Sequence, residues 1–145
     1  MIKLFSILLP LLLIGCANRP LAPENAPTTA ESRVIRKDLL ERQEGRVELR
    51  FIRQAGFGAS GSTADMYLNN ELVARLFGGE KLSIWVKPDL YVVGLRQGVL
   101  FLDNHPGPPT WKIEVDARKG RIYDVRVDLA SWGGIRLNAQ SAPVK

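Results

Sequence analysis

From Arg46 onward, the chain alternates hydrophobic and polar residues with a period of two. Alternation of this kind is typical of β-strands that pack on one side and face solvent on the other. The apolar members of these runs are Val47, Leu49 and Phe51; Leu82, Ile84 and Val86; Tyr91, Val93 and Leu95; Trp111, Ile113, Val115 and Ala117; and Tyr123, Val125, Val127 and Leu129. A last strand is expected from Gly134 to Ala139.

Short groups of turn-forming residues separate these runs, and no helical period lies between them. They are Asn69-Asn70, Gly78-Gly79, Pro88-Asp89, Arg118-Lys119-Gly120 and Gly133-Gly134. The pattern predicts an all-β domain over residues 45–140. We expect a single antiparallel β-sandwich of the immunoglobulin/transthyretin-like kind, with about seven or eight strands.

Residues 111–117 and 123–129 are the cleanest strands, and we expect them to form the final hairpin. Opposite charges across a strand pair are stabilising and like charges are destabilising, which selects one register. That register sets Ile113 opposite Val127, Val115 opposite Val125, Glu114 opposite Arg126, Lys112 opposite Asp128, and Asp116 opposite Asp124.

A tether and a short helix are predicted before the sandwich. Residues 16–30 contain three prolines among small and polar residues, a composition that stays extended. Thr28 and Glu31 have capping-box spacing, and Gly45 is a suitable helix stop. An amphipathic helix is therefore expected over residues 31–44, with an apolar stripe of Val34, Ile35, Leu39 and Leu40.

The N-terminus has the pattern of an export signal. Lys3 precedes an apolar run, Leu4 to Ile14, of eleven residues, whereas a membrane-spanning helix needs about 20. The segment Leu13-Ile14-Gly15-Cys16 then resembles the bacterial lipobox. The resemblance implies that residues 1–15 are a signal peptide, that Leu13, Ile14 and Gly15 are recognised by the signal peptidase, and that Cys16 receives acyl chains.

Cys16 is the one cysteine of the chain, so an intramolecular disulfide is excluded. Each acyl methylene buried in a bilayer contributes about 0.8 kcal/mol, and two or three chains anchor a protein durably. In lipoproteins resembling this one, an aspartate after the cysteine favours inner-membrane retention. Since Ala17 stands there, we expect a periplasm-facing protein anchored in the outer membrane, with the inner membrane as the alternative.

The middle of the chain carries a second resemblance. Met66 to Ala74, then Gly78-Gly79, then Ile84 to Val93 resemble the PEGA-type β-sandwich and related bacterial lipoproteins. Asn70 and Asp89 stand where those domains have glycine, and both residue types tolerate the left-handed turn conformation. The resemblance implies an envelope-binding module without chemistry of its own.

Charge adds little to the choice of partner. Residues 1–15 hold one lysine and no acid, so their removal lowers the net charge from +5 to +4. A net charge of this size, dispersed along the chain, is too small for nucleic-acid binding. The basic window Arg33 to Arg53 fits either a solvated surface or a face apposed to anionic head groups.

The candidate catalytic and ligand motifs are weak. Gly56 to Gly61 has the spacing of a dinucleotide-binding loop, but no helix follows to hold a pyrophosphate. His105 is the one histidine, and with Asp103 it supplies at most two metal ligands. We expect no catalytic residues, no metal and no cofactor, and therefore a protein that is not an enzyme.

The candidate binding residues are few. Phe57 sits in the glycine-rich loop, and the stiff segment Asp103 to Thr110 contains Asp103, His105, Pro106 and Pro108. Trp85 is out of phase with its strand, so it is either covered by the N-terminal helix or a loop, or is exposed as a partner anchor.

These features predict a lipid-anchored, non-enzymatic binding or assembly module whose partner is an envelope protein or the cell wall. The alternatives are an accessory lipoprotein of a secretion machine, a small-ligand or glycan binder and, less favoured, a periplasmic hydrolase.

Overall fold

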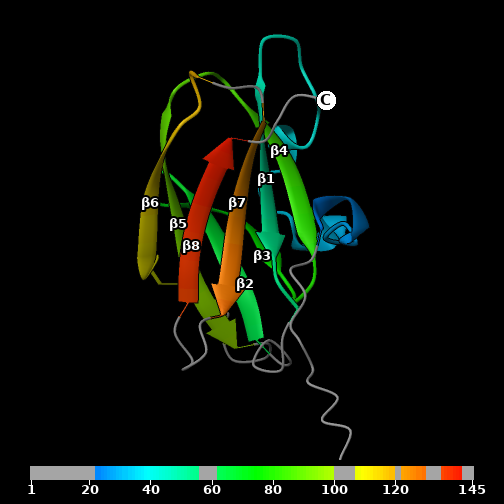
Figure 1. Ribbon diagram of the computed structural model, residues 1–145. Coiled ribbons are helices and arrows are strands. Elements are labelled where there is room, and N and C mark those ends of the chain that lie inside the picture. Colours follow the sequence, from blue (N-terminus) through cyan, green and yellow to red (C-terminus); the bar gives the residue numbers. More distant parts are fainter. Residues whose placement is uncertain (1–21, 56–61, 100–106, 120–121, 130–134, 142–145) are drawn as a thin grey trace, which may run out of the picture.

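The chain folds as a sandwich of two β-sheets (Figure 1). The structure is a computed structural model that describes residues 22–55, 62–99, 107–119, 122–129 and 135–141. The described strands are β1 (Val47–Arg53), β2 (Ser62–Leu68), β3 (Glu71–Leu76), β4 (Lys81–Val86), β5 (Leu90–Val99), β6 (Trp111–Asp116), β7 (Ile122–Leu129) and β8 (Ile135–Ser141). The predicted all-β sandwich is confirmed.

Each sheet has four strands. Sheet 1 has the order β4-β1-β7-β8 and sheet 2 the order β3-β2-β5-β6. All neighbours run antiparallel except β1 and β7, which are parallel, so the expected uniformly antiparallel pairing fails at this one pair. The chain changes sheets four times, which places strands adjacent in sequence in different layers.

The core consists of the apolar residues that alternate along the strands. Leu49 and Phe51 of β1, Ile84 of β4 and Leu95 of β5 are fully buried between the sheets. The period of two therefore identified the inward faces correctly. Asn69 and Asn70, which connect β2 to β3, both have positive φ (50° and 67°), the conformation of a two-residue hairpin turn.

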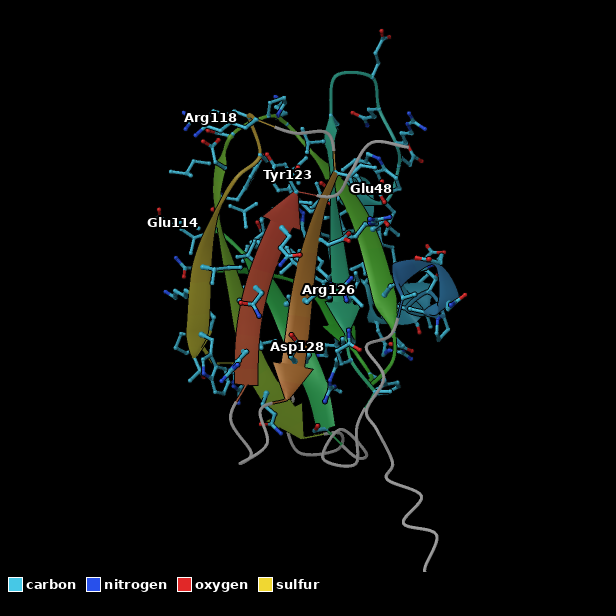
Figure 2. The ribbon with its side chains drawn as sticks, viewed as in Figure 1. Glu48, Glu114, Arg118, Tyr123, Arg126 and Asp128 are labelled. Atoms are coloured by element: carbon cyan, nitrogen blue, oxygen red, sulfur yellow. The ribbon has the colours of Figure 1, made fainter. Side chains whose placement is uncertain are left out.

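The expected final hairpin is wrong. Strand β6 pairs with β5 in sheet 2, while β7 lies between β1 and β8 in sheet 1. Figure 2 shows Glu114 and Arg126 on these different sheets, so no 111–117 to 123–129 register exists. Alternation specifies which face of a strand is buried, but not which strand lies beside it.

The predicted helix over 31–44 is also wrong. Residues 27–40, here called the N-terminal strap, contain two 3₁₀ turns, η2 (Glu31–Arg33) and η3 (Lys37–Leu39), and a further turn, η1 (Pro23–Asn25), precedes them. The Thr29 N–H donates to the Lys81 carbonyl of β4, and the Ile35 N–H donates to the Val73 carbonyl of β3. Because these backbone groups bond to strands, they cannot form an α-helix.

The strap closes one open side of the sandwich (Figure 1). It bridges the edge strand of sheet 1, at Thr28 and Lys81, and the edge strand of sheet 2, at Val34 and Ala74. Val34 and Leu39 enter the core, so part of the predicted stripe is buried although the helix is absent. The folded unit thus begins near residue 27 rather than at residue 45.

Candidate functional site

Most residues predicted to bind lie outside the described residues. These are Leu13, Ile14, Gly15 and Cys16 of the lipobox, Phe57, and Asp103, His105 and Pro106. Trp85 and Pro108 are described, and they lie on opposite sheets.

Trp85 projects from the outer face of edge strand β4. Its neighbours Ile84 and Val86 are buried in the core, whereas Trp85 is half-buried. The Arg46 guanidinium donates a 3.0 Å hydrogen bond to the Trp85 carbonyl and so covers part of the β4 edge. Glu48, opposite Trp85 on β1, accepts a 2.6 Å hydrogen bond from Ser83. These two hydrogen bonds hold the backbone and the neighbouring side chains around Trp85 in place.

Two hollows flank Trp85, and together we call them the Trp85 groove. The first has a volume of about 580 Å³, and its lining includes Arg42, Arg46, Val47, Glu48, Pro88 and Ile122. The second has a volume of about 420 Å³, and its lining includes Thr28, Thr29, Val34, Leu40, Lys81 and Ser83. Trp85 lines both. Strap residues line the second hollow beside Trp85, and the tryptophan is half-buried, neither fully covered nor fully exposed.

Away from Trp85, the outer face of sheet 1 carries charged residues together with one buried apolar residue, Ile52. Arg50 of β1 donates a 2.6 Å hydrogen bond to Asp124 of β7, and Asp128 lies opposite Arg136 of β8. Figure 2 shows Arg126 and Asp128 on the same outer face. The Arg50–Asp124 pair is partly buried, and the half-buried Trp85 is the large aromatic side chain of this face that borders open space.

The Pro-rich segment lies over the outer face of sheet 2. The Tyr67 hydroxyl donates a 2.8 Å hydrogen bond to the Gly107 carbonyl, and the Thr110 N–H donates to the Leu95 carbonyl. Pro109 is buried against Gly94, while Pro108 remains exposed. The described part of this segment, residues 107–110, is thus bound to the sheet rather than extended as a free loop.

A buried polar cluster underlies this segment, and the sequence analysis did not identify it. Asp65 of β2 is 1% exposed, lies 3.5 Å from the Arg75 guanidinium and accepts a hydrogen bond from Thr63. Burial and the nearby Asp65 charge raise the pKa of Tyr67, which also interacts with Arg96. The available signal was on β5, where Gly94 and Gly98 share a face with Arg96 and leave room for close packing.

Neither a metal-ligand group nor a membrane-spanning helix is found among the described residues. Within them no three His, Cys, Asp or Glu side chains are placed to hold a metal ion. In the same part of the chain, no helix is long and apolar enough to cross a bilayer. Comparison with protein-family models and with curated proteins finds no match to the chain.

Proposed function

We propose that this protein is a lipid-anchored lipoprotein of the outer membrane, and that it binds an extended segment of another envelope protein in the Trp85 groove without catalysing a reaction. The anchor in this proposal is Cys16, which follows an apolar run in a lipobox-like context. The first backbone bond from the N-terminal segment to the sandwich joins Pro27 and Lys81. The intervening residues span at most about 40 Å, so the sandwich would stay close to the membrane.

The half-buried Trp85 between two hollows is the observation that carries the binding role. Tryptophan is enriched at the energetic centres of interfaces, where it is surrounded by groups that exclude water. The groove combines this aromatic ring with apolar Val47 and Leu40 and with charged Arg42 and Glu48 at its margins. An apolar centre with a polar rim is the usual composition of a protein-binding surface.

The form of the partner follows from the edge of β4. The strap bonds to the backbone of Lys81, and Arg46 caps the Trp85 carbonyl. Ser83 lies between these two points, so an extended segment could run beside it and place side chains in the hollows. Strand-edge recognition of this kind takes its affinity from backbone hydrogen bonds and its specificity from side-chain pockets.

The anchor is tested by Cys16→Ala in cells given labelled fatty acid. We expect the wild-type chain to incorporate the label, and the variant to lose it and to accumulate as an unprocessed precursor. Acyl label that persists in the variant would refute the anchor, while leaving the groove untested by this measurement alone.

The groove is tested by site-specific photo-crosslinking from Arg42, at its margin, in cells that express the full chain. A discrete crosslinked product with an envelope protein is expected, and Trp85→Ala should reduce it at least about tenfold, the effect of a binding hot spot. Leu90→Ala is the matched control, because Leu90 is 46% exposed and lies outside the groove. Equal loss in both variants, or no loss in either, contradicts the proposal.

The two segments that the sequence predicts to bind a partner, the loop with Phe57 and the stretch Asp103 to Thr110, are competing candidates for the binding site. Phe57→Ala, and separately Ser-Gly-Ser in place of Pro106-Gly107-Pro108, should leave the crosslink unchanged. If either variant removes it while Trp85→Ala does not, the binding surface is a loop rather than the groove.

A glycan ligand is the second candidate, because the Trp85 ring lies beside polar Ser83 and Glu48 in the manner suited to a sugar ring. Titration with soluble cell-wall fragments distinguishes it. A saturable change in tryptophan fluorescence that disappears in Trp85→Phe would favour the glycan over the protein segment.

A further inference from the structure

The four edge strands of the sandwich are protected unequally. On the side of the strap, the backbone of Lys81 in β4 bonds to Pro27 and Thr29, and the Val73 carbonyl of β3 accepts hydrogen bonds from the strap. Exposed edges are where sheets add further strands, and proteins usually block them. The strap blocks β3 at Val73 and β4 at Lys81, and the remaining stretch of the β4 edge, beside Ser83, belongs to the Trp85 groove proposed above to bind a partner.

The opposite side is bordered by β6 and β8 (Figure 1). Strand β6 carries the charged residues Lys112, Glu114 and Asp116, which disfavour added strands. Strand β8 has one charged residue, Arg136, has no proline, and pairs with β7 in an unbroken register. Within the part of the chain that the structure describes, no backbone hydrogen bond reaches the outer edge of β8.

We propose that β8 pairs antiparallel with β8 of a second copy of this chain, with Asn138 on the two-fold axis. Asn138 is the middle residue of β8, so with Asn138 on the axis every residue of the strand lies opposite a residue of the second copy. With the axis at any other residue, some residues at the ends of the strand would have no partner. It joins the two copies of sheet 1 into one continuous sheet. An isologous two-fold contact of this kind is the commonest form of homodimer.

The side chains agree with this register. Arg136 lies opposite the uncharged Gln140 of the second copy, so no like charges meet. Leu137 lies opposite Ala139 of the second copy on the core side, where both already pack against the core. A register centred on Arg136 would instead oppose two guanidinium groups.

Cysteine crosslinking of the purified full-length chain in mild detergent tests the dimer. Residues directly opposite on antiparallel strands have Cα atoms about 4.5–5.5 Å apart, which suits a disulfide. Asn138→Cys should therefore form a reducible dimer at least about tenfold faster than Gln97→Cys, because the paired strands raise the local thiol concentration. Gln97 is exposed on the interior strand β5, and the wild-type chain gives the background rate of dimer formation.

The register has its own control. Gln140→Cys would lie about 13 Å along the strand from its own copy and should crosslink no faster than Gln97→Cys. Crosslinking of Gln140→Cys as fast as that of Asn138→Cys overturns the register. Dimer formation by Asn138→Cys at the rate of Gln97→Cys overturns the interface.

Charge reversal gives a second readout that needs no disulfide. Asn138→Lys and Asn138→Asp each place like charges on the axis and should weaken self-association by up to about fivefold, which corresponds to about 1 kcal/mol. Mixing the two variants should restore it in sedimentation experiments. A mixture that associates no better than either variant alone contradicts the proposal.

Discussion

Gly94 lies under the Pro-rich segment, and its replacement by alanine tests whether that segment is part of the folded sandwich. A Cβ atom at this position would lie 2.7 Å from the Pro109 Cβ, 2.9 Å from its Cγ and 3.2 Å from the Tyr67 Cβ. Carbon contacts become ordinary at 3.4 Å, so Pro109 would have to move by about 0.7 Å. Gly94 is thus required by close packing and not by its φ angle.

The cost of Gly94→Ala is the difference between two effects. Pro109 is followed by the Thr110 hydrogen bond to Leu95, and Tyr67 holds the Gly107 carbonyl, so the segment resists movement. Overpacking of a well-packed site costs about 1–3 kcal/mol. Replacing glycine in a strand by alanine returns about 0.5–1 kcal/mol. We therefore expect the free energy of unfolding to fall by about 1–2 kcal/mol.

Urea unfolding followed by tryptophan fluorescence measures this change. Gly107→Ala is the matched control, since its nearest non-neighbouring atom is the Arg96 Cζ at 4.0 Å. Its effect should stay within about 0.5 kcal/mol. Pro109→Gly removes both clashing carbons, so the double variant with Gly94→Ala should be more stable than additive single effects allow. Additive effects, or equal stability of Gly94→Ala and Gly107→Ala, would refute the reasoning.

Three further predictions concern other contacts, each with its own control or readout. Arg53→Met should lower the free energy of unfolding by about 2–4 kcal/mol, because Arg53 is only 3% exposed and donates hydrogen bonds to two carbonyls and a hydroxyl. Arg118→Met, at an exposed site, should have a much smaller effect, and equal effects of the two substitutions would contradict this reasoning. The hydrogen bond from Arg118 holds the pKa of Asp116 below its ordinary 3.8, so the stability it contributes is complete above pH 3.8 and is lost as the pH falls through the folded-state pKa. Arg118→Ala should raise that pKa in an NMR titration, and an unchanged value would exclude the pair as its cause. Val34→Ala should cost about 1.5 kcal/mol and speed amide exchange in the strap, whereas Ile35→Ala, at a residue 51% exposed, should do neither.

The inward faces of the strands could be predicted from the sequence because burial acts on each strand separately. Leu49 and Phe51 alternate with charged residues, and this pattern holds whichever strand lies beside them. The turn at Asn69 and Asn70 was predictable for a similar reason, since these residues adopt positive φ at low cost. Local preference and fold agree at these positions.

Strand neighbours could not be predicted in this way. Opposite charges do pair across strands, as expected, but Asp124 contacts Arg50 of β1 and Asp128 faces Arg136 of β8. The partner expected for Asp128, Lys112, lies in the other sheet. Charge complementarity is a property of a pair, and several pairings satisfy it until the chain order of the two sheets is known.

The candidate site was likewise predictable from the sequence only in part. Trp85 was recognisable because its phase is opposite to that of Ile84 and Val86, which is visible in the sequence alone. The second hollow beside it depends on the strap, whose course was predicted as a helix. The strap differs because its N–H groups find carbonyl acceptors on β3 and β4. Hydrogen bonds within a helix and to a sheet edge are similar in strength, so helix propensity alone could not decide between them.

The sequence by itself determined that the chain forms strands, which apolar residues of the alternating runs face the core, and where turns such as Asn69-Asn70 lie, because these depend on residues close together in the chain. Only the tertiary structure decided that β1 lies beside β7, that residues 27–40 close one side of the sandwich, and that the Tyr67 hydroxyl donates a hydrogen bond to the Gly107 carbonyl. Each of these contacts joins residues distant in sequence. Its free energy depends on the burial and hydrogen bonding that the whole assembly provides, which no local pattern contains.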